Sequence, residues 1–199
     1  LDPVTLPHFY YVTPVDPAWS DEQAEGWLRH LNNACLENIS VHEVFPGHFV
    51  QVVDSYRGAG LLRNAFWYGG FGEGWAHYTE LLAIEQGLAD RRPSLELAMV
   101  QDALLRAGRF SATVGMHTEG MSLDEATRMF EERAHVPRIA AEREAVRGTW
   151  DPMYLVYTYG KLEILRWREE LGRRGDFDLK RFHDTMIGAG AIPLAVMRE

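Results

Sequence analysis

The chemistry of this chain is concentrated in four residues of two short segments. His42 and His48 bracket the segment His-Glu-Val-Phe-Pro-Gly-His, in which Glu43 directly follows the first histidine, and Glu73 lies in a second segment downstream. Two imidazoles and a carboxylate can hold zinc and leave a fourth position for water, while a further carboxylate takes a proton from that water. We therefore predict a catalytic zinc site with His42, His48 and Glu73 as ligands and Glu43 as the general base.

The spacing of the two histidines requires a break in the helix between them. They stand six positions apart, which is roughly 240° around an ideal helix, so a continuous helix would point them to different sides. Pro46 lacks an amide hydrogen and crowds the preceding turn, and Gly47 tolerates unusual backbone dihedrals. The Pro46-Gly47 pair is therefore predicted to turn the chain so that His42 and His48 reach one ion.

The second segment places another histidine and another acid beside the third predicted ligand. Glu73 and His77 are four positions apart and Glu80 follows about one turn later, so the three lie near one another on a helix. We expect His77 and Glu80 to orient a ligand histidine or the Glu73 carboxylate through hydrogen bonds. His77 in place of Glu73 as the third ligand is an open alternative.

Three other interpretations compete with a catalytic zinc site. Ser40 with Glu43 also fits a capping box at a helix start, which would occupy the Glu43 carboxylate. Glu132-x-x-His135 in a helical chain suggests a carboxylate-bridged di-iron protein, but the sequence has no second Glu-x-x-His. The third is a non-catalytic helical module with a structural or degenerate metal site.

These motifs resemble those of a known family, the bacterial zincin-like proteins called domain-of-unknown-function 885. The stretches His-Glu-x-x-Pro-Gly-His at 42–48 and Glu-Gly-Trp-Ala-x-Tyr-x-Glu at 73–80 both fit its pattern, and the resemblance covers nearly all of residues 8–199. The sequence departs from that pattern at His77, where an aliphatic residue is usual, and at Thr113, where an acid is usual. Further similar segments are Gly115-Met116-His117, Tyr157-Thr158-Tyr159-Gly160, Phe182-His183-Asp184 and 188–194.

The resemblance implies a helical zinc metallopeptidase, related to gluzincins such as carboxypeptidase Taq and the peptidyl-dipeptidases, that acts on a peptide or a small amide. It places Tyr157 and His117 in recurring motifs, and because each can donate a hydrogen bond, both are candidates to stabilise an oxyanion. Packing of a buried tyrosine explains Tyr157 equally well. Family members are longer, so we expect this chain to be their C-terminal catalytic part, with the N-terminal part of the same protein completing the cleft.

Two cations are candidates for binding the carboxylate of a substrate, as a carboxypeptidase requires. Arg109 offers a planar fork that suits a bidentate grip on a carboxylate, and Lys161 offers a mobile ammonium group. Residues of this kind are more often solvated or paired with acids on a helix surface.

Composition narrows the functional classes. The net charge of −9 and the absence of a basic run argue against nucleic acid and anionic membrane surfaces as partners. Cys35 is the only cysteine, so there is no internal disulfide, and zinc must be held by nitrogen and oxygen as in catalytic sites. No run of about 18 apolar residues is present, which predicts no membrane span. The compartment stays open, with the cytoplasm favoured and a removed signal segment as the alternative.

The elements that must position these residues are predicted to be helices. The exception is the aromatic and β-branched segment 8–14, which is predicted as a strand. We expect Trp67, Phe71 and Trp75 in the core. The fold class is all-α, a zincin-like single domain over residues 1–199 with one N-terminal strand. Caps and apolar periodicity predict helices at about 20–38, 73–86, 94–115, 122–135, 138–147, 152–171 and 178–187.

Overall fold

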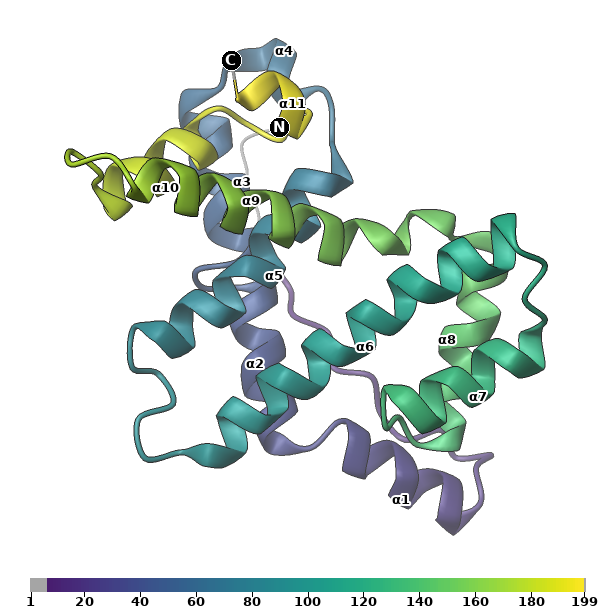
Figure 1. The fold of residues 1–199 in the computed structure, drawn as a ribbon. Helices are drawn as coiled ribbons and strands as arrows, with labels where there is room; N and C mark the ends of the chain where they lie inside the picture. Colours follow the sequence, from purple (N-terminus) through teal and green to yellow (C-terminus); the bar gives the residue numbers. More distant parts are fainter. Residues whose placement is uncertain (1–6, 199) are drawn as a thin grey trace. The chain divides into compact units, whose positions relative to one another are not determined.

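The computed structural model describes residues 7–198, and these are all-helical, as predicted (Figure 1). Within them, none of the helices combines the length and the apolar composition that crossing a bilayer requires. The elements in chain order are α1 (Asp21–His30), α2 (Asn33–Glu43), α3 (His48–Gly58), α4 (Gly60–Asn64), α5 (Gly69–Glu85), α6 (Pro93–Thr118), α7 (Leu123–Arg133), α8 (Arg138–Trp150), the 3₁₀ turn η1 (Pro152–Leu155), α9 (Val156–Gly172), α10 (Leu179–Gly188) and α11 (Leu194–Met197).

The predicted N-terminal strand is wrong. Residues 8–14 follow an irregular path with exposed side chains, and Phe9 and Tyr11 are 72% and 84% exposed. A strand needs a partner for its backbone N–H and C=O groups, and no strand forms elsewhere between residues 7 and 198. Aromatic and β-branched residues favour a strand only where such a partner exists.

Local capping signals account for several helix starts. Ser20 forms the predicted capping box at the start of α1. The single helix predicted over 20–38 is divided in two, because Asn32 Oδ1 accepts hydrogen bonds from the amides of Ala34 and Cys35 and starts α2. The division matters for the site, because α2 is the helix that carries His42.

The capping box proposed for Ser40 and Glu43 does not form. The α2 helix continues through Ser40 and ends at Glu43, so neither residue stands at a helix start. A capping box does form where predicted at Ser122 and Glu125, at the start of α7. The carboxylate of Glu43 is therefore available for other chemistry.

The chain folds into two compact units, each with its own apolar core. The first unit contains Ser40–Leu88 and Val156–Glu199, and the second contains Tyr10–Ile39 and Ala89–Leu155. In the first unit, α5, α9 and α10 supply the buried side chains of Phe71, Trp75, Tyr78, Ile164, Trp167 and Phe182. In the second unit, α6, α7 and α8 supply those of Leu95, Met99, Phe130, Ala141 and Ala145.

Glycines allow α5 and α9 to cross in close contact within the first unit. A Cβ atom on Gly160 would lie 1.9 Å from the carbonyl oxygen of Gly70, and one on Gly74 would lie 2.5 Å from the Cα atom of Gly160. No larger residue fits at these positions without separating the helices. The crossing places the start of α9 beside the segment of α5 that carries Glu73.

Candidate metal centre

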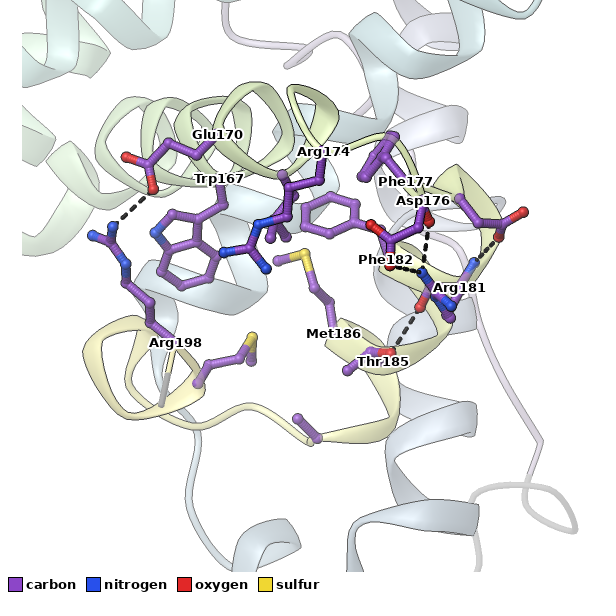
Figure 2. A pocket seen from close by; sticks show the side chains of 14 residues that line it. Trp167, Glu170, Arg174, Asp176, Phe177, Arg181, Phe182, Thr185, Met186 and Arg198 are labelled. Carbon is purple, nitrogen blue, oxygen red and sulfur yellow. Dashed lines mark hydrogen bonds and ion pairs between the residues drawn. The ribbon is translucent and has the colours of Figure 1, made fainter.

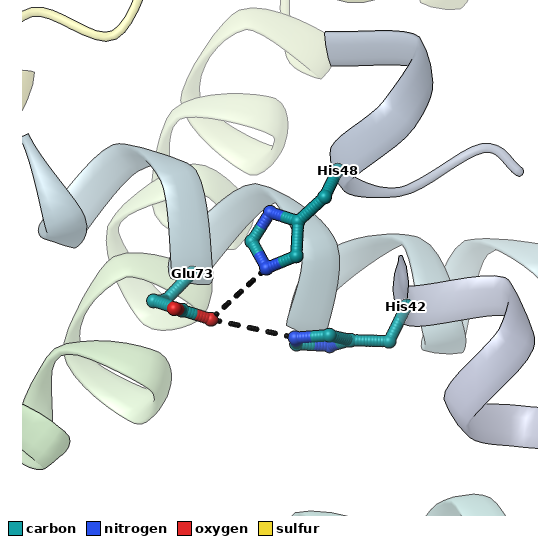
Figure 3. A group of neighbouring side chains, drawn as sticks. All are labelled: His42, His48 and Glu73. Atoms are coloured by element: carbon teal, nitrogen blue, oxygen red, sulfur yellow. Dashed lines mark hydrogen bonds and ion pairs between the residues drawn. The ribbon is translucent and has the colours of Figure 1, made fainter. Parts of the chain in front are cut away.

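Three side chains of the first unit, each from a different helix, converge on one point. His42 comes from the last turn of α2, His48 is the first residue of α3, and Glu73 lies in the first half of α5. Glu73 Oε2 is 3.4 Å from His42 Nε2 and 3.2 Å from His48 Nε2. Ligand atoms of the three residues all lie within 4.8 Å of one another. Figure 3 shows the two imidazoles reaching the carboxylate from different helices.

A tight turn brings the two histidines together, as the Pro46-Gly47 pair predicts. The α2 helix ends at Glu43 and α3 begins at His48. The amide of Gly47 donates to the carbonyl of Val41 over 3.1 Å, and a Cβ atom on Gly47 would lie 1.8 Å from the carbonyl oxygen of His42. Position 47 therefore requires glycine because the turn folds back directly onto the backbone of the first histidine.

The side chain of Trp75 holds this turn from α5. Its indole Nε1–H donates to the carbonyl oxygen of Pro46 over 3.1 Å, and its ring is 2% exposed. Trp75 stands two residues after Glu73 on the same helix. One helix therefore supplies both the carboxylate and a hydrogen bond to the loop between the histidines.

Glu80 orients His42 from a fully buried position. His42 Nδ1 lies 2.6 Å from Glu80 Oε1, and because an ionised carboxylate only accepts, the ring nitrogen donates. The second oxygen, Glu80 Oε2, is 3.2 Å from His77 Nδ1. This arrangement leaves His42 Nε2 directed at Glu73, and it fits the orienting role predicted for Glu80 and His77. His77 is outside the convergent group in residues 7–198, which favours Glu73 as the third ligand.

The environment keeps the Glu73 carboxyl ionised. Burial by itself raises the pKa of this group, but the contacts with His42 and His48 outweigh burial and hold the pKa well below its ordinary range. A carboxylate must be deprotonated to bind a metal ion. Glu73 is thus in the protonation state that a metal ligand needs at neutral pH.

Two aromatic side chains flank the histidines. The ring of Tyr157, at the start of α9, stacks on His42 with a centroid distance of 6.1 Å and an interplanar angle of 27°. The ring of Trp67 lies 6.0 Å from that of His48. Phe71 and Trp75 are in the core as predicted, but Trp67 is 54% exposed, so the core prediction for it is wrong. No pattern in the sequence indicates that Trp67 lies beside His48.

The other predicted residues lie as follows. Glu43 is the exposed last residue of α2, adjacent in sequence to the buried His42. Lys161 is half-buried on α9 in the first unit. In the second unit, His117 Nε2 is 2.8 Å from the carbonyl oxygen of Gly148.

Arg109 makes the bidentate grip predicted for a substrate carboxylate, but to a carboxylate of the chain itself. Its Nε and Nη2 atoms each donate to Glu144 over 2.7 Å within the second unit. The guanidinium fork is therefore engaged by the protein.

The helical pair required by the di-iron interpretation is not formed. The α7 helix ends at Arg133, and His135 lies beyond it with a positive φ of 52°. Glu132 and His135 are both exposed and do not share a helical face. In the part of the chain that the structure describes, the only convergent group of metal-binding side chains is His42, His48 and Glu73.

A separate pocket of about 470 Å³ lies in the first unit, at the end of α9 and along α10 (Figure 2). Trp167, Phe182 and Met186 form its apolar side, and Arg174 and Arg198 lie at its edge. None of the predicted site residues lines this pocket.

Relatives of the chain are recognisable in sequence and in structure. A family described as "Bacterial protein of unknown function (DUF885)" matches residues 2–199. A protein of solved structure from Shewanella oneidensis, described as a lipoprotein of unknown function, is 32% identical with a TM-score of 0.85, over 98% of this chain and 36% of that one. Another described lipoprotein, from Colwellia psychrerythraea, is 34% identical with a TM-score of 0.79, over 83% of this chain and 29% of that one.

The chain thus spans a minor part of the length of either solved relative. No curated protein matches it. Because the family match extends over nearly all of its residues, the chain belongs to the DUF885 family of bacterial proteins.

Proposed function

We propose that this chain carries the active site of a zinc-dependent hydrolase that cleaves peptide bonds, as a carboxypeptidase or a peptidyl-dipeptidase does. The observation that supports it is the convergence of His42, His48 and Glu73, whose ligand atoms lie within 4.8 Å of one another. The substrate class is a short peptide or a small amide. In the longer protein, the N-terminal part would complete the cleft.

The donor set fits zinc. Two imidazole nitrogens and one carboxylate are the usual protein ligands of catalytic zinc, whereas structural zinc sites favour cysteine. The single cysteine, Cys35, belongs to the second unit, whereas all three ligands belong to the first. His42 is already held in the required tautomer, because its Nδ1–H donates to Glu80 and its Nε2 is directed at Glu73.

Different residues would bind the metal, transfer the proton and stabilise the oxyanion. Zinc, when bound, lowers the pKa of a water molecule to about 7 and polarises the scissile carbonyl. The Glu43 carboxylate takes a proton from the attacking water and passes it to the nitrogen of the leaving amine. The Tyr157 hydroxyl donates a hydrogen bond to the oxyanion as negative charge develops there. Lys161, in the same unit as the three ligands, is a candidate anchor for a substrate carboxylate.

Elemental analysis of the purified chain tests the metal site. We expect about one zinc per chain in the wild type and a loss of that zinc in His48→Ala. His135→Ala is the matched control, because it removes an exposed histidine outside the site and should leave the zinc in place. Full occupancy in His48→Ala would contradict the ligand set.

A peptide-library assay then tests the reaction. The wild type should cleave a subset of peptides, and Glu43→Gln should bind zinc but release no product. A zinc-loaded wild type that cleaves nothing, alone or as part of the longer protein, would support the non-catalytic module instead.

A further inference from the structure

The fully buried side chains of α3 are polar. His48, Gln51 and Ser55 stand at i, i+3 and i+7, so they follow one another along one side of the helix. Gln51 is 0% exposed and Ser55 is 4% exposed, and these are the buried residues of the helix. A helix in a globular protein normally turns an apolar stripe to the core. The polar residues of α3 therefore need a specific reason to be there.

The buried position of Ser55 is explained by a hydrogen bond within the fold. Its hydroxyl donates to the carbonyl oxygen of Ile187 in α10 over 3.0 Å. The carboxamide of Gln51 differs, because neither its Nε2 nor its Oε1 has a hydrogen-bond partner in residues 7–198. A buried amide without a partner is costly, and such groups commonly serve a site.

One turn before Gln51, the Nδ1 atom of His48 also lacks a hydrogen-bond partner among the described residues. Its Nε2 is directed at Glu73, so Nδ1 is on the other side of the ring, where it is buried and has no partner in the same described residues. His42, in contrast, has its Nδ1 on Glu80. Histidines that bind metals almost always donate the second ring N–H to an acceptor, which fixes the ring.

We propose that Gln51 is the residue that positions His48, through acceptance of the Nδ1–H by its carboxamide oxygen. Side chains at i and i+3 are neighbours on a helix, with Cβ atoms about 5–6 Å apart. A rotation of the Gln51 side chain, or one bridging water, closes the remaining gap. The inference rests on the proposed function for its zinc readout, and its claim about the ring of His48 stands without zinc.

The two ligand histidines then have different partners. His42 donates to the carboxylate of Glu80, and His48 donates to a neutral amide. A negatively charged acceptor makes an imidazole a stronger donor to the metal than a neutral acceptor does. Gln51 therefore fixes the orientation of His48 without the addition of a further buried negative charge beside Glu73 and Glu80.

The first arm of the test measures the zinc dissociation constant of the full chain by competition with a chromophoric chelator. Gln51→Met keeps the size of the side chain and removes the acceptor, so zinc binding should weaken by about 10–100-fold. Ser55→Ala is the matched control on the same side of α3 and should stay within about 3-fold of the wild type. Gln51→Glu restores an acceptor and should recover most of the affinity lost in Gln51→Met.

Urea unfolding of the zinc-free variants separates positioning from general stability. Gln51→Met should unfold at the same or a higher urea concentration than the wild type, because an apolar side chain replaces a buried amide without a partner. Ser55→Ala should unfold at a lower concentration, since it loses the bond to Ile187. Weaker zinc binding that comes only with lower stability in Gln51→Met would overturn the positioning role, as would an unchanged zinc affinity.

The second arm uses NMR of the zinc-free chain and does not depend on the proposed function. The ¹⁵N chemical shift of His48 Nδ1, assigned by the loss of its signal in His48→Ala, should be the same in the wild type and in Ser55→Ala. In Gln51→Met it should change, because the ring nitrogen loses its hydrogen-bond partner. If the wild type bound no zinc, the proposed function would fail, and this arm would still decide the inference. An unchanged shift in Gln51→Met would overturn it.

Discussion

Both units of this protein contain buried or half-buried acids, and the acids of the two units have different partners. In the second unit, Glu144 forms a bidentate salt bridge with Arg109, and the two side chains are 15% and 12% exposed. In the first unit, the carboxylates of Glu73 and Glu80 contact the imidazoles of His42, His48 and His77. A guanidinium always carries a positive charge, whereas an imidazole is mostly neutral at pH 7.

This difference separates two clusters. The cluster of Arg109 and Glu144 contains its own positive charge, whereas the cluster of Glu73, Glu80 and their histidines is suited to bind a cation. Burial by itself raises the pKa of Glu144, but Arg109 outweighs burial and holds the pKa below its ordinary range. The positive charge that balances Glu144 is thus supplied by Arg109. In the first unit, the carboxylates of Glu73 and Glu80 lie beside imidazoles that can offer lone pairs, and the zinc ion proposed above would supply positive charge there.

The largest expected difference between the two units is in the effect of a substitution on kcat. Glu43→Gln removes the proposed general base of the first unit, and we expect kcat for a cleaved peptide to fall by about 10²–10⁴-fold. Zinc content should remain that of the wild type. Glu132→Gln, which changes an exposed glutamate of the second unit, should leave kcat unchanged. An equal loss in both variants would remove the special role of Glu43.

Stability should respond most strongly in the second unit. Glu144→Gln removes the charged carboxylate that the buried Arg109 guanidinium grips, and we expect a loss of about 3–5 kcal/mol in the free energy of unfolding measured with urea. The zinc content should not change. A parallel loss of zinc would show that the two clusters are not independent.

The pH dependence of that stability follows from the lowered pKa of Glu144. A carboxyl group with a lowered pKa in the folded state stabilises the fold above its ordinary pKa of about 4.3, and this contribution is lost as the pH falls through the lower folded value. The wild type should therefore lose more unfolding free energy between pH 5 and acid than Glu144→Gln does.

Zinc affinity should be sensitive to Glu80. Glu80→Gln keeps the shape of the side chain but removes the charge that accepts from His42, so zinc should bind about 10–100-fold more weakly. Chelator competition measures this change. Glu144→Gln is the comparison, and affinity there should equal that of the wild type. Unchanged affinity in Glu80→Gln would mean that the 2.6 Å contact has no part in metal binding.

The smallest effect is expected at the turn between the histidines. Trp75→Phe loses the hydrogen bond to Pro46 and should cost about 0.5–1.5 kcal/mol of stability and a few-fold in zinc affinity. Trp167→Phe is the matched control, because the Nε1 of Trp167 has no hydrogen-bond partner in residues 7–198. Zinc affinity should not change in the control. A similar loss in both variants would assign the effect to packing.

The sequence predicted what depends on local chemistry. The caps at Ser20 and Ser122 lie where the pattern of residues places them, because a cap involves only the first turn of a helix. The break at Pro46-Gly47 follows from the backbone restrictions of those two residues. The choice of His42, His48 and Glu73 came from ligand chemistry, and the structure brings these three side chains together.

Other features depend on contacts between elements and could not be predicted in this way. The strand at 8–14 failed because strands require partners. Trp67 was assigned to the core by its hydrophobicity, although its exposed place beside His48 is set by the turn between α4 and α5. Gln51 could have been found from its i+3 spacing to His48, but only once α3 was known to begin at His48.

The polar side of α3 also has a consequence for the dynamics of the protein. Because the fully buried residues of α3 are Gln51 and Ser55, and Val50 packs against the core while only partly buried, this helix gains less from the hydrophobic effect than α5 does. Zinc bound by His48 would therefore stabilise the start of α3, and this stabilisation would grow with the free zinc concentration. Amide hydrogen exchange should then slow in α3 when zinc is added and change least in α5, whose buried aromatic side chains already hold it in place.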